Sequence, residues 1–111
     1  MTRTGPAEVR RRQRDAAIAL LGLLALDLPT VTWTVNEERD VPLEGLAMAF
    51  SSPDVDAATV DAWAAHFGVT PTWQPHTSGG YWKARAVVSG VRVEVWAGLP
   101  VQPASTPRGD A

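Results

Sequence analysis

The chain has 111 residues, of which 45% are hydrophobic and 20% charged, so it can build the core of one globular domain and is not a disordered chain. It contains no cysteine, which excludes disulfides, thiolate metal sites and cysteine nucleophiles. Residues 1–14 hold five arginines and one glutamate, a net charge of +4, whereas residues 15–111 hold five basic and eleven acidic residues, a net charge of −6. We therefore expect a basic leader on an acidic domain.

The first segment reads EVRRRQRDAAIALLGLLAL and combines clustered arginines with an apolar run. An export signal is one interpretation, but Asp15 separates its charged and apolar parts and no small-residue cleavage site follows before Pro29. An amphipathic segment lying on a membrane surface is another. A helix that begins near Pro6 and ends at Pro29 accounts best for the composition, because Ala, Leu, Arg and Gln are strong helix formers.

The apolar residues of this helix form two neighbouring stripes and predict a broad face laid on a sheet: Ile18, Leu21 and Ala25, and Leu20, Leu24 and Leu28. Four arginines come before these stripes and oppose the helix dipole: Arg10, Arg11, Arg12 and Arg14. They are interpreted either as a solvated end or as a contact with phosphate or an acidic partner. The acidic remainder of the chain favours the solvated end, because it would repel a polyanion.

A hairpin is predicted next. In TVTWTV, residues 30–35, the apolar residues Val31, Trp33 and Val35 alternate with threonine, which indicates a strand with one buried face. A polar turn follows at residues 36–40. In the second strand, residues 44–50, the residues expected to share a face are Leu46, Met48 and Phe50. The short connection predicts antiparallel pairing.

The second helix has clear start and stop signals. Ser52 is suited to cap it with Pro53 in its first turn, and Gly68 is suited to end it in a left-handed conformation. The buried stripe is expected to consist of Val60, Trp63, Ala64 and Phe67. Residues 69–73 then predict a short edge strand, because Pro71 interrupts them, and residues 74–80 predict a polar loop.

The stretch YWKARAVVSGVRVEVWAG predicts a hairpin with a two-residue turn at Ser89-Gly90. Counting back from this turn pairs, on the core face, Val88 with Val91, Ala86 with Val93, Ala84 with Val95 and Trp82 with Ala97. The other face pairs Val87 with Arg92, Arg85 with Glu94 and Lys83 with Trp96. The tryptophans Trp33 and Trp63 also fall on core faces, whereas Trp73 fits either side.

Taken together, the elements predict an α+β domain of order α-β-β-α-β-β-β. The expected architecture is an antiparallel sheet of four to five strands with two helices on one face. Residues 1–5 are expected to be a flexible N-terminus, residues 6–99 the single domain and residues 100–111 a disordered tail, because the tail is rich in Pro, Ser and Thr.

Catalytic and metal-binding patterns are not found. The two histidines, His66 on the second helix and His76 in the predicted loop, have no short spacing typical of metal ligands. No nucleophile with a matching base is evident, and Ser78-Gly79-Gly80 lacks the remainder of a phosphate-binding loop. We therefore expect a protein that is not an enzyme and uses no metal or cofactor.

The outward side of the final hairpin is the best candidate for an interaction site. Its residues are Tyr81, Lys83, Arg85, Arg92 and Trp96. Aromatic and basic groups on a sheet are typical both of protein interfaces and of single-stranded nucleic-acid sites. An ordinary solvated sheet face, with a cation–π pair of Lys83 and Trp96, is the alternative without function.

The segments DLPTVTWTV, VDAWAAHFGV and VSGVRVEVWAGL, together with the leucine-rich helix, resemble small uncharacterised proteins of high-GC bacteria and of their phages and integrative elements. The resemblance covers residues 16–99. It implies an accessory factor that acts by binding. We expect a cytoplasmic protein-interaction module that does not bind membranes. Nucleic-acid binding through the basic helix and the hairpin is the alternative function, and a second copy of the chain is another candidate partner.

Overall fold

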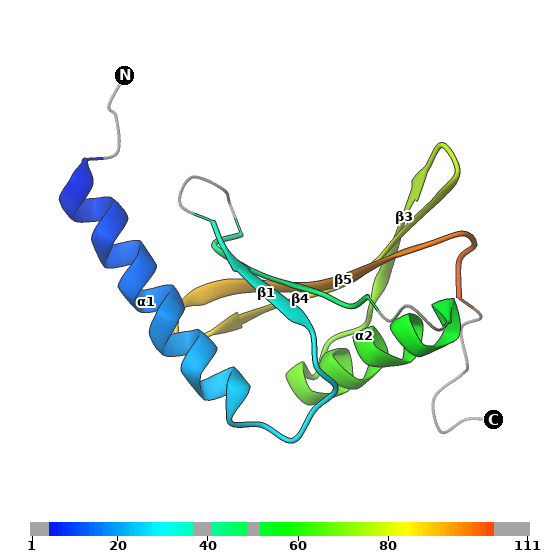
Figure 1. Ribbon diagram of the computed structural model, residues 1–111, viewed down its shortest axis with the longest axis horizontal. Coiled ribbons are helices and arrows are strands. Elements are labelled where there is room, and N and C mark those ends of the chain that lie inside the picture. The colour runs from blue at the N-terminus through cyan, green and yellow to red at the C-terminus, as the bar shows by residue number, and fades with distance from the viewer. Residues whose placement is uncertain (1–4, 37–40, 49–51, 104–111) are drawn as a thin grey trace.

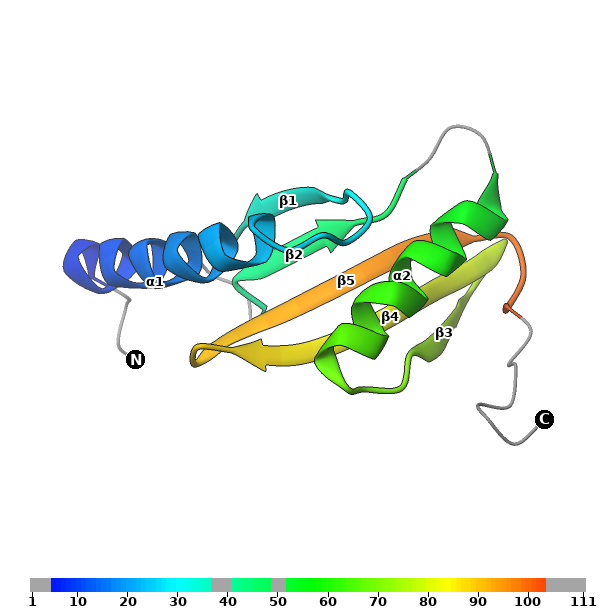
Figure 2. The same ribbon diagram turned by 90° about the horizontal axis from the view of Figure 1, so that it is seen from below.

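A computed structural model describes residues 5–36, 41–48 and 52–103. Within them the elements follow the predicted order: α1 (Pro6–Leu24), β1 (Thr32–Val35), β2 (Leu43–Leu46), α2 (Pro53–Phe67), β3 (Thr72–His76), β4 (Gly79–Val88) and β5 (Val91–Leu99). Both helices lie on the same side of the sheet, as expected for this α+β fold (Figures 1 and 2). Residues 1–4 and 104–111, most of the predicted flexible end and tail, lie outside the described residues.

The five strands form one sheet of order β1-β2-β5-β4-β3. Three neighbouring pairs are antiparallel, but β2 and β5 run parallel, so the prediction of a purely antiparallel sheet is wrong at this pair. The parallel pair arises because α2 and the β3–β4 hairpin separate β2 from β5 along the chain. Such a long crossover allows two strands to pair in the same direction.

The β4–β5 hairpin confirms the predicted register at all seven predicted pairs, from Val88 opposite Val91 to Trp82 opposite Ala97. Its turn has positive φ at both central residues, 51° at Ser89 and 79° at Gly90. Positive φ at both positions defines a type I′ turn, whose twist matches that of the flanking strands. The turn therefore fixes which side chains of the hairpin share a face.

The predicted limits and buried stripe of α2 are also confirmed. The Ser52 hydroxyl accepts a hydrogen bond of 3.0 Å from the Asp54 N–H, and Gly68 takes the left-handed conformation with φ 72°. Val60, Trp63 and Ala64 are buried against the sheet, and Phe67 packs at the edge of the same core. This helix covers β4 and β5 (Figure 2).

Helix α1 differs from the prediction in its end and in its buried side. It ends at Leu24, before Pro29 is reached, and its buried residues are Ala16, Ala19 and Leu23. The predicted face is only partly correct: Leu20 and Leu28 pack against the core, whereas Ile18, Leu21 and Leu24 are 60%, 71% and 62% exposed. The side that meets the sheet carries the small residues Ala16 and Ala19, which let the helix approach closely, together with the buried Leu23.

The first hairpin forms as predicted, with β1 antiparallel to β2, but the predicted face of β2 is wrong. Leu43, Gly45 and Ala47 are buried, whereas Leu46 is half-buried and Met48 is exposed. Phe50 lies outside the described residues. A shift of one residue exchanges the two faces of a strand, and the complete burial of Leu43 against β5 decides between them.

The predicted side of β1 is only partly correct. Val31, just before the strand, is buried, Trp33 is half-buried, and Val35 is 38% exposed. Since β1 is the first strand of the sheet order, no further strand of the described chain covers its outer edge.

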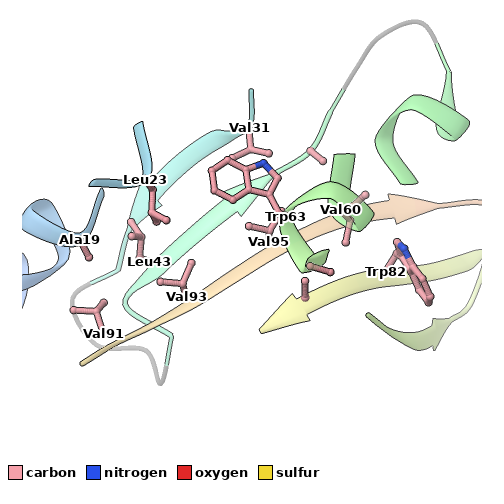
Figure 3. Close-up of a cluster of buried hydrophobic side chains, with 14 of the residues drawn as sticks. Ala19, Leu23, Val31, Leu43, Val60, Trp63, Trp82, Val91, Val93 and Val95 are labelled. Carbon is pink, nitrogen blue, oxygen red and sulfur yellow. The ribbon is translucent and has the colours of Figure 1, made fainter. Parts of the chain in front are cut away.

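The core lies between the sheet and the two helices (Figure 3). Leu43, Val60, Val93 and Val95 are its largest fully buried residues. Trp82 of β4 donates a hydrogen bond of 2.8 Å from its indole N–H to the Asp61 carboxylate, which ties α2 to the sheet. The core side of β4 and β5 is thus filled, and their other side is left for solvent.

Candidate interaction surface

The side of the sheet opposite to the helices is covered by no helix of the described chain (Figure 1). We call it the outer face. The alternation along the strands and their registers assign its residues as Thr72, Gln74 and His76 of β3; Tyr81, Lys83, Arg85 and Val87 of β4; Arg92, Glu94, Trp96 and Gly98 of β5; Glu44 and Leu46 of β2; and Thr32 and Thr34 of β1. All five candidate residues of the hairpin therefore share one surface.

An aromatic group stands at one end of the outer face. The ring of Tyr81 lies 5.4 Å from that of Trp96 in an edge-to-face arrangement, at an interplanar angle of 84°. The His76 ring lies 5.5 Å from Tyr81 on its other side. Such contacts fix the rings in place, and each contributes about 1 kcal/mol beyond the buried area. A partner would meet a preorganised aromatic surface.

The Lys83 ammonium, beside these aromatic rings, does not lie over the ring that the strand register suggests. Lys83 pairs with Trp96 across the strands, but its ammonium lies 5.5 Å from the ring centre of Tyr81. The expected cation–π pair is therefore formed with Tyr81, its neighbour on the same side of β4. Lys83 makes no ion pair with any described residue, so its charge is available at the surface.

The centre of the outer face is nearly neutral. Arg85 donates a hydrogen bond to Glu94, whose side chain is only 8% exposed although it points away from the core. Glu44 of β2 lies opposite Glu94 in the parallel pair of strands. The Asn36 side-chain amide donates a 2.8 Å hydrogen bond to the Glu44 carboxylate. Arg85 thus balances a buried carboxylate and is the least available of the three predicted cations.

Shallow hollows lie at both ends of this face. One, of about 330 Å³, lies beside His76 and Tyr81, where Gly79 and Gly98 leave room because they have no side chains. The other, of about 380 Å³, lies between Arg85, Val87 and Arg92 near the hairpin turn. Both are open, which suits a protruding side chain of a partner better than an enclosed small molecule.

The two histidines do not converge. His76 is the last residue of β3, so its prediction as a loop residue is wrong, and it lies on the outer face. His66 is exposed on α2, on the helix side of the sheet. Among residues 5–36, 41–48 and 52–103, no three His, Asp or Glu side chains come together as metal ligands.

The N-terminal arginines form a separate surface. Arg10, Arg11 and Arg14 line one open hollow with Ala7 on α1, which lies on the helix side of the sheet (Figure 2). Arg11 and Arg12 both bond to Glu8, at 2.7 and 3.2 Å. The hydrogen bond from Arg11 lowers the pKa of the Glu8 carboxyl below its ordinary value. The arginines therefore belong to a different element from the outer face, on the half of α1 that extends beyond the end of the sheet (Figure 2).

Two members of the outer face, His76 and Glu44, were not among the predicted site residues. The pairing of β3 with β4 places His76 beside Tyr81, and the parallel pairing of β2 with β5 places Glu44 beside Glu94. The β2–β5 pairing has no local sequence signal. For the β3–β4 pairing, the alternation of Thr72, Gln74 and His76 is a weak indication.

No family model matches the chain, and neither the curated proteins nor the solved structures include a match to it. Neither helix of the described chain has the length and hydropathy that a membrane-spanning helix needs.

Proposed function

We propose that the protein is a protein-interaction module that binds its partner with the outer face of the sheet. The observation that carries this proposal is the contact of Tyr81 with Trp96 on a sheet face that no described helix covers. Tyr and Trp supply a large contact area at a small entropic cost, and with Arg they are the residues most enriched at interface hot spots. Arg92 lies on the same face, exposed, at its other end.

The charges of the outer face favour a protein over a nucleic acid. Binding of a single strand requires several cations along its path and bases stacked on open aromatic rings. Here Glu94 neutralises Arg85, and of the other outer-face cations among the described residues only Lys83 and Arg92 remain, at separated positions on β4 and β5. The edge-to-face contact also partly occupies the ring of Tyr81. A partner with mixed polar and apolar side chains matches this surface better.

The test compares three forms of the full chain as bait in a lysate of the native host, with quantitative detection of retained proteins. The outer-face variant carries Trp96→Ala and Arg92→Glu. The matched control carries Val55→Ala and Arg12→Glu, which also remove one apolar side chain and reverse one arginine, but on α2 and α1. Far-UV circular dichroism establishes that all three are folded.

We expect a defined protein to be retained by the unchanged chain and by the control, and to be reduced at least tenfold with the outer-face variant. Equal retention by all three forms would contradict the role of this face. Retention that disappears after nuclease treatment and weakens steeply with salt would instead support the alternative function, nucleic-acid binding led by Arg10, Arg11, Arg12 and Arg14.

A further inference from the structure

We infer that α1 is a self-association element, which pairs antiparallel with α1 of a second copy of this chain. This inference is independent of the proposed function, because it concerns residues of α1, and the outer face contains no residue of α1. It rests on two observations on the same side of the helix, an uncovered apolar seam and a charge distribution that contradicts the dipole of the helix.

The first observation is the apolar seam. Ile18 and Leu21 are 60% and 71% exposed, on the side of α1 opposite to the buried Ala16, Ala19 and Leu23, and Leu24, 62% exposed, flanks them. Positions 14, 18, 21 and 25 follow the four-three-four spacing of a coiled-coil seam, with an isoleucine and a leucine at its centre. Exposed large side chains of this regularity on a monomer indicate a covered surface.

The exposed side of α1 is also accessible to a second helix. No residue of α1 before Ala16 is buried, and the N-terminal half of α1 extends beyond the end of the sheet (Figure 2). Ala17, Ala25 and Gly22 flank the seam and are exposed, and a methyl group added at Gly22 would meet nothing within 4 Å. Small flanking residues allow two helices to pack at a distance of about 8–10 Å.

The second observation concerns charge. Arg10, Arg11 and Arg14 lie on the outward side near the positive end of the helix dipole, whereas the last turn of α1 has no basic residue beside its negative end. Arg10 and Arg14 make no ion pair with any described residue. In an isolated α1, the arginines therefore lie at the end of the helix where the dipole disfavours positive charge.

In an antiparallel pair, the arginine-bearing half of each helix lies beside the C-terminal end of the other helix. With Ile18 of one helix packed on Leu21 of the other, Arg14 lies beside the C-terminal turn of the partner helix around Ala25, which has no basic residue of its own. A parallel pair would instead place arginine against arginine. The same surface serves both copies, as in an isologous two-fold dimer. A second copy is thus a partner with the required apolar spacing, and the negative end of its helix dipole faces Arg14.

The test uses the full chain in sedimentation velocity over a range of concentrations up to submillimolar. Since two short helices bury less than the roughly 1,600 Å² of a standard interface, we expect a dimer of micromolar affinity. Leu21→Glu should weaken it at least tenfold. The matched control is Val87→Glu, which replaces a similarly exposed residue, 67% against 71%, on β4 and should leave the dimer unchanged.

Orientation is tested by disulfide crosslinking, which is unambiguous because the chain has no native cysteine. Arg14→Cys and Ala25→Cys variants are mixed under oxidising conditions. An antiparallel pair gives the mixed dimer between the two variants. Crosslinks of each variant only with itself would contradict the antiparallel arrangement.

Three other outcomes overturn the inference. One is a monomer at all concentrations, and another is a dimer that survives Leu21→Glu. The third is a monomer in solution that binds vesicles containing anionic phospholipid and loses this binding with Leu21→Glu; that result would identify a lipid surface as the occupant.

Discussion

The indole N–H of Trp63 donates a 2.8 Å hydrogen bond to the backbone carbonyl of Pro29, which joins α2 to the connection between α1 and β1. Trp63 is 3% exposed and also meets Trp33 of β1 edge-to-face, with ring centres 5.4 Å apart. A single side chain of α2 therefore contacts both the connection after α1 and strand β1 (Figure 3).

Replacing Trp63 by Phe removes this hydrogen bond and part of the buried ring volume. We expect the free energy of unfolding to fall by about 2–4 kcal/mol, from the lost hydrogen bond and the cavity together. The measurement is urea unfolding followed by circular dichroism. Trp96→Phe is the control, since Trp96 is only half-buried on the outer face, and it should cost below about 1.5 kcal/mol. Equal losses would contradict the special role of Trp63.

Gly80 and Gly98 lie on neighbouring strands and should respond differently to alanine. A methyl group at Gly80 would come within 2.5 Å of the Trp73 ring and 2.6 Å of the Gln74 carbonyl oxygen, whereas at Gly98 it would meet nothing within 4 Å. Because the backbone of β3 must move, Gly80→Ala should destabilise the fold by about 1–3 kcal/mol. Gly98→Ala should have no destabilising effect. Thermal unfolding of the two variants checks the pairing of β3 with β4.

The Arg85–Glu94 pair is a test of how the outer face tolerates charge. Arg85→Met leaves the carboxylate of Glu94, 8% exposed, next to Glu44 without its cation, so we expect a loss of about 1–3 kcal/mol in stability. The double variant Arg85→Met with Glu94→Met should recover most of this loss, because no buried charge is left unpaired. A double-mutant cycle in urea measures the coupling, and purely additive effects would disprove it.

The pKa of Glu8 should lie below 4.5, the ordinary value for Glu, because Arg11 donates a hydrogen bond to its carboxylate. A lowered folded-state pKa means that the pairing stabilises α1 above the ordinary pKa and that this contribution disappears as the pH falls through the lowered value. Side-chain carboxyl NMR titration measures the shift. Arg11→Ala should move the pKa upward, and Arg14→Ala, which removes an arginine that does not bond to Glu8, should move it less.

How much of this fold is readable from the sequence depends on how local the deciding interactions are. The β4–β5 register follows from the two-residue turn at Ser89-Gly90, and the ends of α2 follow from Ser52 and Gly68, each acting within a few residues. The position of Tyr81 and Trp96 on one face was predictable for the same reason.

The faces of α1 and β2 were not predictable in this way. Leucine and alanine positions on α1 give two acceptable stripes, and only contact with the sheet selects the side with Ala16 and Ala19. Likewise, the buried face of β2 is determined by its parallel pairing with β5, a strand that is far away in the sequence. The place of His76 beside Tyr81 depends on the β3–β4 pairing, which local spacing does not specify.

The place of β5 in the sheet has a consequence for synthesis. It is the last of the five strands in chain order, yet it lies at the centre, between β2 and β4. As the chain leaves the ribosome, the β1–β2 hairpin has no further strand to join until residues 91–99 have emerged. Leu43 and the apolar side of α2 would remain exposed through this interval. Ribosome-bound chains that stop before residue 91 should therefore be held by chaperones or degraded, and those that include β5 should become resistant to protease.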